Sequence, residues 1–316
     1  MKVKLYILAG LLLSNTFVQQ AYSQGSGFNR ANEWKKYRKE VTLMVGAAQF
    51  LGDLGGLNKT GTHYSPVDLE FSMTRPAVSL GYRYKVTKNF NWYSSFNYLL
   101  VAGDDKLTAE KYRNNRNLNF KSNIFELSTR AELAFFKHRA GHRYNIRNTS
   151  GYKNRTWELL GFVGVGVFYF NPKGNQGAGW VKLQPLHTEG QGLPGGPKQY
   201  KRISISIPVG LSYRMMLNKY WSIGAEINYR KTFTDYIDDV STSYYDKYAL
   251  GQAYGPVAVA MADPSKGTIP NATAPDGYGN GAQRGDKDKD SYMAVQITVG
   301  RFFPPKRSKT KLRSKF

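Results

Sequence analysis

The chain contains no cysteine and only four histidines, at positions 63, 138, 142 and 187, among its 316 residues. Without cysteine there is no disulfide framework, no thiolate-based metal site and no lipid anchor attached through a cysteine. The shortage of histidine leaves few candidates for the base that an activated serine requires, and no G-x-S-x-G motif accompanies them. The sequence therefore predicts a protein that is not an enzyme, with no catalytic residues and no cofactor.

Long hydrophobic runs are also missing after the first 23 residues. No stretch approaches 18 consecutive apolar residues, and the mean hydropathy of −0.51 is far too polar for a helical membrane protein. The N-terminus has a basic start at Met1–Lys4, an apolar run at Leu5–Leu13 that is too short to span a bilayer, and a small-x-small cleavage site at Ala21–Ser23. Residues 1–23 are therefore predicted to be a signal peptide for export, with Gln24 as the first mature residue.

Acidic residues are scarce. The chain has 22 Asp and Glu against 45 Lys and Arg, which gives a formal net charge of +23. Such a basic chain could bind nucleic acid, but an exported protein does not meet it, so no nucleic-acid partner is expected. The position of the charge is more informative than its total, because basic residues gather before residue 40, between residues 137 and 155, and after residue 303.

The sequence does contain a recurring two-residue alternation of apolar and polar side chains. In the segment 203–215, every second residue is Ile, Val, Leu, Tyr or Met, and the residues between them are Ser, Pro, Gly and Arg. A soluble sandwich usually has a charged exposed face, whereas here the polar face is rich in small residues. Small residues with a few charges suit the crowded lumen of a small barrel.

Eight such segments can be counted, an even number, as a bacterial barrel needs if both ends are to lie in the periplasm. We expect strands near residues 40–51, 75–86, 90–102, 122–137, 156–170, 202–216, 220–232 and 291–303. Tight turns at 87–89 and 217–219 alternate with long connections at 52–74, 103–121, 171–201 and 233–290. The stretch 138–155 falls at the same end of the barrel as the tight turns, but it is long and basic. The prediction is an all-β fold, an eight-stranded antiparallel transmembrane β-barrel with long extracellular loops. It spans 40–303, between a periplasmic segment at 24–39 and a basic periplasmic tail at 304–316.

Aromatic residues cluster at the ends of these segments, as girdles at the two membrane interfaces would require. The expected girdle residues are Tyr82, Tyr84, Phe90, Trp92, Phe135, Phe136, Trp157, Tyr169, Phe170, Trp221, Phe302 and Phe303. Ordinary enrichment of aromatic residues in strands is the alternative explanation.

The inward faces carry charges of both signs. These residues are Arg83, Lys85, Glu126, Arg130, Glu132, Glu158, Arg214, Glu226 and Arg230. We expect them to form lumenal ion pairs that close the barrel, because an unpaired charge is costly where water is scarce. A selective pore is the functional alternative, although eight strands leave an interior that side chains fill.

Several segments resemble a known family. Phe50–Gly56 reads FLGDLGG, Arg75–Tyr84 reads RPAVSLGYRY and is followed by a turn and Asn89-Phe90, and Asn32–Trp34 lies upstream. Together they resemble the DUF6089-like outer-membrane β-barrel family of Bacteroidota that includes PorG of the type IX secretion system, most closely over residues 30–135. The resemblance implies an eight-stranded barrel whose periplasmic side meets other secretion or motility components. It leaves the loop 233–290 and the basic tail unassigned.

The clustered positive charge indicates where such a partner would bind. On the expected layout the charge lies in the periplasm, where one sign on one face attracts and orients an oppositely charged protein. The candidate partner-binding residues are Lys137, Arg139, Arg143, Arg147, Lys306, Arg307, Lys309 and Lys311. The outer loop 233–250 carries Asp235, Asp238, Asp239 and Asp246 instead. Solubility and snorkelling at the interface are the alternative explanation for the basic residues.

The favoured function is a structural or interaction component associated with type IX secretion or gliding machinery. Its expected partners are outer-membrane lipid and periplasmic proteins, with no small-molecule substrate. A lipid-modifying enzyme using His63 or His187, a narrow channel, and an adhesin using loop 233–290 remain open. Calcium binding by Asp286, Asp288 and Asp290 is also open, although the turn glycine and distal glutamate of an EF-hand loop are absent.

Overall fold

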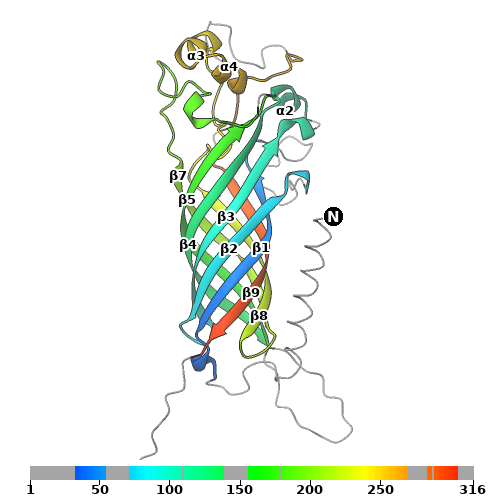
Figure 1. Cartoon of the computed structure of the whole chain (residues 1–316), viewed down its shortest axis with the longest axis vertical. Coiled ribbons are helices and arrows are strands. Elements are labelled where there is room, and N and C mark those ends of the chain that lie inside the picture. Colours follow the sequence, from blue (N-terminus) through cyan, green and yellow to red (C-terminus); the bar gives the residue numbers. More distant parts are fainter. Residues whose placement is uncertain are drawn as a thin grey trace, which may run out of the picture.

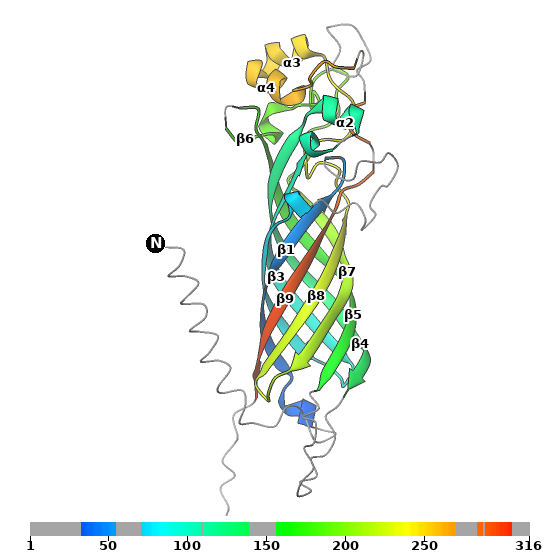
Figure 2. The same cartoon turned by 90° about the vertical axis from the view of Figure 1, so that its right-hand side faces the viewer.

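The computed structural model describes residues 33–54, 71–108, 110–138, 156–177, 179–269, 283–286 and 288–304, and these form a closed antiparallel β-barrel (Figures 1 and 2). Its long strands are β1 (Lys39–Leu51), β2 (Arg75–Lys85), β3 (Phe90–Asp104), β4 (Asn119–His138), β5 (Trp157–Gly174), β7 (Ile203–Met216), β8 (Trp221–Thr232) and β9 (Ser291–Phe303). Neighbours pair in the order β4-β3-β2-β1-β9-β8-β7-β5, and β4 pairs with β5 to close the ring. The expected eight-stranded barrel is confirmed. A two-residue strand, β6 (Val181–Lys182), pairs antiparallel with the end of β5.

The alternation in the sequence places apolar side chains outside and polar ones inside. On β4, for example, Leu127 is exposed whereas its neighbours Glu126 and Ser128 are buried. The exposed apolar residues include Val45, Leu80, Phe96, Leu127, Val165, Ile205, Ile227 and Ile297. Water would disfavour such a surface on a soluble barrel, and lipid favours it.

Aromatic residues mark the two edges of this apolar surface. Tyr82, Trp92, Phe135, Phe136 and Phe303 are exposed at the edge next to the tight turns, and Tyr169 on β5 lies at the opposite edge. On β5, Trp157 and Tyr169 are twelve residues apart, about 40 Å along a strand, and about 30 Å along the axis of a barrel whose strands tilt by roughly 40°. That height matches the hydrocarbon core of a bilayer, about 30 Å.

Two of the expected girdle residues do not belong to the girdles. Phe170 and Phe302 are 0% and 3% exposed and face the interior. Phe170 is in phase with inward Phe168, and Phe302 is in phase with inward Gly300. The expectation was wrong because it used the position of these residues along the strand without the phase of the alternation.

A bulge near the end of β4 changes that phase locally. The pairing of β4 with β5 shifts between Ala134 and Phe136, so Phe135 and Phe136 are both exposed. After the bulge, Lys137 lies opposite Glu158. One extra residue thus turns Lys137 toward the lumen.

The long connections gather at one end of the barrel, at the top of Figure 1, and carry helices that the sequence pattern did not predict. The helices are α2 (Lys111–Arg116), α3 (Lys247–Tyr254) and α4 (Pro256–Ala262), with 3-10 turns η3 (Phe71–Met73), η4 (Asp105–Leu107) and η5 (Gln184–Leu186). A further 3-10 turn, η1 (Glu33–Lys36), precedes β1 at the opposite end of the barrel. Asp246 accepts a hydrogen bond from the Ala249 amide and so caps α3. No helix among the described residues is long and apolar enough to cross a membrane.

The barrel interior has two layers. An apolar cluster fills the half next to the long connections; its members include Phe50, Leu99, Val101, Phe120, Ile124, Phe168, Phe170, Ile237, Val240 and Tyr292. Charged side chains fill the half next to the tight turns. Glu40 near the start of β1 and Arg83 near the end of β2, for example, both lie at that end of the barrel. The interior is therefore occupied along its length.

Candidate functional site: the lumenal charge network and the outer cap

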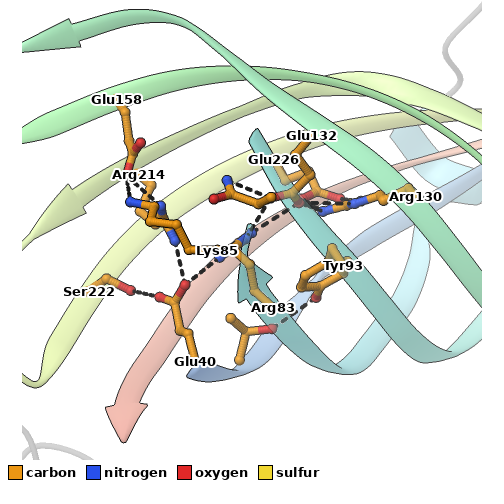
Figure 3. Close-up of polar contacts among 12 residues, drawn as sticks. Glu40, Arg83, Lys85, Tyr93, Arg130, Glu132, Glu158, Arg214, Ser222 and Glu226 are labelled. Atoms are coloured by element: carbon orange, nitrogen blue, oxygen red, sulfur yellow. Dashed lines mark hydrogen bonds and ion pairs between the residues drawn. The ribbon is translucent and has the colours of Figure 1, made fainter. Parts of the chain in front are cut away.

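Ten inward side chains from six strands form what we call the lumenal charge network. Its members are Glu40, Arg83, Lys85, Glu126, Arg130, Glu132, Glu158, Arg214, Glu226 and Arg230, all buried. Figure 3 shows the central members converging from strands on several sides of the barrel. The structure thus brings together the nine inward charged residues that the sequence placed in the lumen, and adds Glu40 to them.

A chain of alternating charges crosses the lumen. Arg83 binds Glu40 through Nη1 at 2.8 Å and Glu132 through Nε at 2.6 Å. Glu132 also binds Arg130, at 3.0 Å. Arg130 then makes two bonds of 2.6 Å to both carboxylate oxygens of Glu226. The chain runs from β1 through β2 and β4 to β8, which lies three strands beyond β4 around the ring.

A second group of ion pairs lies at the end with the tight turns. Arg214 binds both Glu40 and Glu158, and so joins this group to the first chain. Glu158 also pairs with Lys137 at 3.1 Å and with Lys85 at 3.6 Å. One carboxylate from β5 thus holds cations from β2, β4 and β7.

A third group joins the charges to the apolar cluster. Arg230 Nε pairs with Glu126 at 2.8 Å, and the Tyr292 hydroxyl donates to the same carboxylate at 2.6 Å. The Tyr292 ring packs edge-on against Phe168, with centroids 5.8 Å apart. The two layers of the interior are therefore continuous.

Aromatic rings separate the guanidinium groups within the network. The Tyr93 ring lies 4.8 Å from Arg83 Cζ and 4.2 Å from Arg130 Cζ, and Arg130 also lies 3.8 Å from the Phe162 ring. Such cation–π contacts are strongest where water is excluded. Gly81 leaves the room that this packing needs, because a Cβ there would overlap the Tyr93 hydroxyl. The small residues on the polar face of the strands are thus explained by the bulky charged groups beside them.

This arrangement favours closure over catalysis. Every charged member of the network has an opposite charge within ion-pair distance. A buried carboxylate held between two guanidiniums is a poor base and a poor nucleophile. The network fills the lumen and ties strands together across it.

The connections at the other end fold into what we call the outer cap, formed by the described parts of 52–54, 104–118, 183–200 and 233–290. Arg116 donates to the Asp105 carboxylate at 2.7 Å, to the Asp53 carbonyl at 2.7 Å and to the Arg284 carbonyl at 2.5 Å. Arg284 in turn donates to the Asp239 carbonyl at 2.6 Å and to Glu189 at 3.1 Å. Half-buried Arg116 and buried Arg284 therefore lock four connections together over the mouth of the barrel.

A stack of rings continues the apolar cluster into the cap. Phe170 stacks on Tyr200 with centroids 6.2 Å apart, and Tyr200 stacks on Tyr236 at 4.5 Å. The Tyr200 hydroxyl donates to Asp239 at 2.5 Å. The cap is thereby anchored to the barrel interior by packing as well as by hydrogen bonds.

The cap carboxyls lie in an environment that favours protonation. Burial and the neighbouring Asp286 carboxylate together raise the pKa of Asp53 to about 7, against the opposing effect of Arg116. Burial also raises the pKa of Asp235 to about 8, and that of Asp239 to about 6 against the opposing effect of Arg284. Of the four aspartates that loop 233–250 carries, Asp238 and Asp239 are buried.

Raising the pH from about 5 to about 9 is expected to loosen the outer cap. The carboxyls of Asp53, Asp235 and Asp239 have pKa values above the ordinary value of about 3.9. Their contribution to stability is therefore complete below about pH 3.9 and is lost as the pH rises through about 6 to 8. Amide hydrogen exchange across residues 235–242, corrected for intrinsic rates, should accelerate by at least about tenfold, the effect of one pKa unit. Corrected exchange in the middle of β5 serves as the control, and cap exchange that slowed with rising pH would contradict the sign of these shifts.

Several predicted site residues lie in other places than expected, or lie outside the residues that the structure describes. Lys137, expected on a partner-binding surface, donates to the Lys88 carbonyl and pairs with Glu158. The other partner-binding candidates, Arg139, Arg143, Arg147, Lys306, Arg307, Lys309 and Lys311, lie outside the described residues, as do His63 and His142. The partner-binding prediction therefore rests on the sequence.

The two described histidines are not arranged for catalysis. His138 was expected outside the strands but is the last residue of β4, and its ring stacks on Trp157 with centroids 6.0 Å apart. His187 Nδ1 lies 2.7 Å from the Gln191 carbonyl, and its ring stacks on Tyr254 at 4.3 Å. Within the described residues, neither ring is hydrogen-bonded to a serine hydroxyl or to a carboxylate.

The alternating aspartates before β9 do not share one environment. Asp288 is exposed, whereas Asp290 is buried and accepts a hydrogen bond from the Ile237 amide at 2.8 Å. Asp290 therefore fixes the loop after β8 and is not part of a solvated stretch. In the part of the chain that the structure describes, no group of three or more histidine or acidic side chains is placed to hold a metal ion.

Comparisons with known proteins agree with the family resemblance over the first half of the barrel. Residues 29–171, less than half of the chain, match the family model described as "Domain of unknown function (DUF6089)", which confirms the DUF6089-like character of this part. No curated protein matches the sequence.

Solved structures that are similar to this chain include the following three. Neisserial surface protein A has a TM-score of 0.35 and 7% identity, covering 84% of this chain and 97% of that chain. Ail, the attachment invasion locus protein of Yersinia pestis, crystallised with the heparin analogue sucrose octasulfate, has a TM-score of 0.35 and 11% identity, covering 84% and 99%. Outer membrane protein AlkL in lipid bilayers has a TM-score of 0.28 and 11% identity, covering 90% and 96%.

Proposed function

We propose that this protein is an outer-membrane β-barrel that acts as a structural and interaction component, with neither enzymatic activity nor solute conduction. The observation that carries the proposal is the buried chain of paired charges from Glu40 to Glu226, which crosses the lumen. Passage of a solute would require these pairs to separate in a space that excludes water, at a cost of several kcal/mol per ion. With its interior occupied, the barrel acts through its surfaces.

The outer membrane is the location that fits the exterior. The apolar surface between the aromatic girdles matches the thickness of a bilayer, and closed barrels satisfy every backbone polar group without water. The predicted signal peptide at residues 1–23 supplies the route of export. The tight turns then lie in the periplasm and the outer cap outside.

A periplasmic protein of the type IX secretion or gliding machinery is the proposed partner. The match to the DUF6089 model includes the segments that carry the resemblance to the PorG family. At the periplasmic end, Lys35, Lys36, Lys39 and Lys88 are exposed, in addition to the basic turn and tail predicted from the sequence. A surface of this sign fits an acidic partner and would orient its approach.

Crosslinking in intact cells, followed by purification of the full chain, tests this proposal. The wild type should bring down a periplasmic protein with an acidic surface. Changing Arg139, Arg143, Arg147, Lys306, Lys309 and Lys311 to glutamine should reduce its recovery roughly tenfold or more, because close charge pairs at an interface contribute about 1.5 kcal/mol or more each. A variant with six lysines of the outer loops changed to glutamine has the same net charge and should recover it normally. Equal recovery with both variants would contradict the proposed surface.

A further inference from the structure

Three lysines lie in one row on the outside of the barrel, just beyond the apolar surface. Lys121 on β4 is the register partner of Lys173 on β5, and Lys173 is the register partner of Lys182 on β6. Directly opposed residues in antiparallel strands point to the same face, with Cβ atoms about 5 Å apart. Lys121 and Lys173 are in phase with the outward residues of their strands, and Lys182 is exposed. We call these three residues the lysine row.

Like charges in register repel one another, and no carboxylate among the described residues offsets them here. Every charged member of the lumenal network has an ion-pair partner, but none of the three row lysines is paired with an acidic side chain of the described residues. The other register partner of Lys121, across β3, is Ala102. A row of like charges directly opposite one another destabilises a sheet unless an anion binds between them.

The position of the lysine row identifies the anion. Two residues toward the bilayer from the row lie Asn123 and Asn171, and two residues further lie Phe125 and Tyr169, which belong to the aromatic girdle. The row is therefore four residues from the girdle, about 13 Å along the strand and about 10 Å along the axis of a barrel tilted by roughly 40°. Polar headgroups occupy the zone next to the hydrocarbon core, several ångströms thick on each side, and lysine side chains extend toward it.

Neighbouring residues complete a surface that is suited to a headgroup. The Lys121 ammonium lies 3.9 Å from the centroid of the Trp180 ring, and the Arg202 guanidinium lies 5.5 Å from that of Tyr169. Arg202 immediately precedes β7 and lies beside the end of β5, because the Phe170 amide donates to the Arg202 carbonyl. Amphipathic rings with cations above them are typical of the boundary between hydrocarbon and water.

We propose that the lysine row binds phosphate groups of a phosphorylated lipid in the leaflet that meets the outer cap. A membrane lipid is the source, and not free phosphate, because the row continues an apolar surface that contacts acyl chains. Lysines whose Cβ atoms lie about 5 Å apart have side chains long enough to place their ammonium groups around one phosphate. The proposal rests on the membrane location and orientation given above.

Native mass spectrometry of the full chain in detergent tests the site with two lipids. The probes are bisphosphorylated lipid A and the same lipid after removal of its phosphates. The wild type should retain the phosphorylated form. Removing the phosphates should lower the affinity roughly 100-fold, because each of the three lysines contributes about fivefold. The variant with Lys121, Lys173 and Lys182 all changed to glutamine should show the same loss. The corresponding arginine variant should retain the lipid.

Three other lysines provide the matched control. Lys106, Lys111 and Lys198 are exposed, and changing them to glutamine removes the same charge without touching the row. This variant should bind as the wild type does. The proposal is overturned if both lipids are retained equally, if the row variant retains the phosphorylated lipid, or if inorganic phosphate at the lipid's concentration displaces it. Heat-modifiable migration in gels reports separately on the barrel, so loss of the fold is distinguished from loss of the site.

Discussion

Changing Glu40 to glutamine is expected to lower the free energy of unfolding by about 3–5 kcal/mol, the usual cost of removing one partner from a buried ion pair. Glu40 is 1% exposed and accepts hydrogen bonds from Arg83 at 2.8 Å, from Arg214 and from the Ser222 hydroxyl at 2.5 Å. Glutamine keeps the shape of the side chain but removes the negative charge that two guanidiniums share. Urea unfolding of the protein in lipid vesicles, followed by tryptophan fluorescence, measures the change.

An exposed carboxylate provides the control for this substitution. Asp288→Asn removes the same charge from an exposed site and should change the free energy of unfolding by less than about 0.5 kcal/mol. A second substitution, Arg214→Met, should restore part of the loss in E40Q, because Glu158 keeps Lys85 and Lys137 as partners. If E40Q is as stable as the wild type, the network does not hold the barrel together.

Changing Val163 to arginine is expected to cost about 2–4 kcal/mol in a bilayer, the cost of a cation on the lipid face of a barrel at mid-depth. Val163 lies midway between Trp157 and Tyr169 on β5, and its register partners are Ala131 and Val209. Its side chain is 54% exposed and points outward. On a water-soluble barrel the same change would be nearly neutral.

The control for this change has the same residue type and nearly the same exposure. Val257 on α4 of the outer cap is 49% exposed, and Val257→Arg should alter the free energy of unfolding by less than about 0.5 kcal/mol. Both variants are unfolded in vesicles and compared with the wild type. Equal effects at the two positions would show that the strand exterior does not contact lipid.

The strands and the lumenal charges could be predicted because both follow from a period of two. An inward charge such as Arg214 repeats at the strand period, so its face is visible in the sequence. The errors arose where the period is interrupted or ignored. The bulge at Ala134–Phe136 turns Lys137 inward without any sign in the sequence, and Phe170 was assigned by its place near a strand end alone.

The outer cap could not be predicted, because its contacts connect loops that have no period. Arg116 and Arg284 are 168 residues apart in the chain, yet the side chain of the first donates to the carbonyl of the second. The burial of Asp238 and Asp239 in loop 233–250 could not be predicted for the same reason. Asp239 is buried under Arg284 and Tyr200, and only the folded structure brings these groups together.

The central claim is that a membrane-spanning barrel is closed by its own paired charges. Recording ionic current across planar bilayers that contain the folded full chain tests this claim most directly, with heat-modifiable migration of the same sample showing that the barrel is folded. The lumenal charge network and the apolar cluster predict no conductance steps above those of the protein-free bilayer. Stable, reproducible conductance steps from the folded wild type would contradict the account.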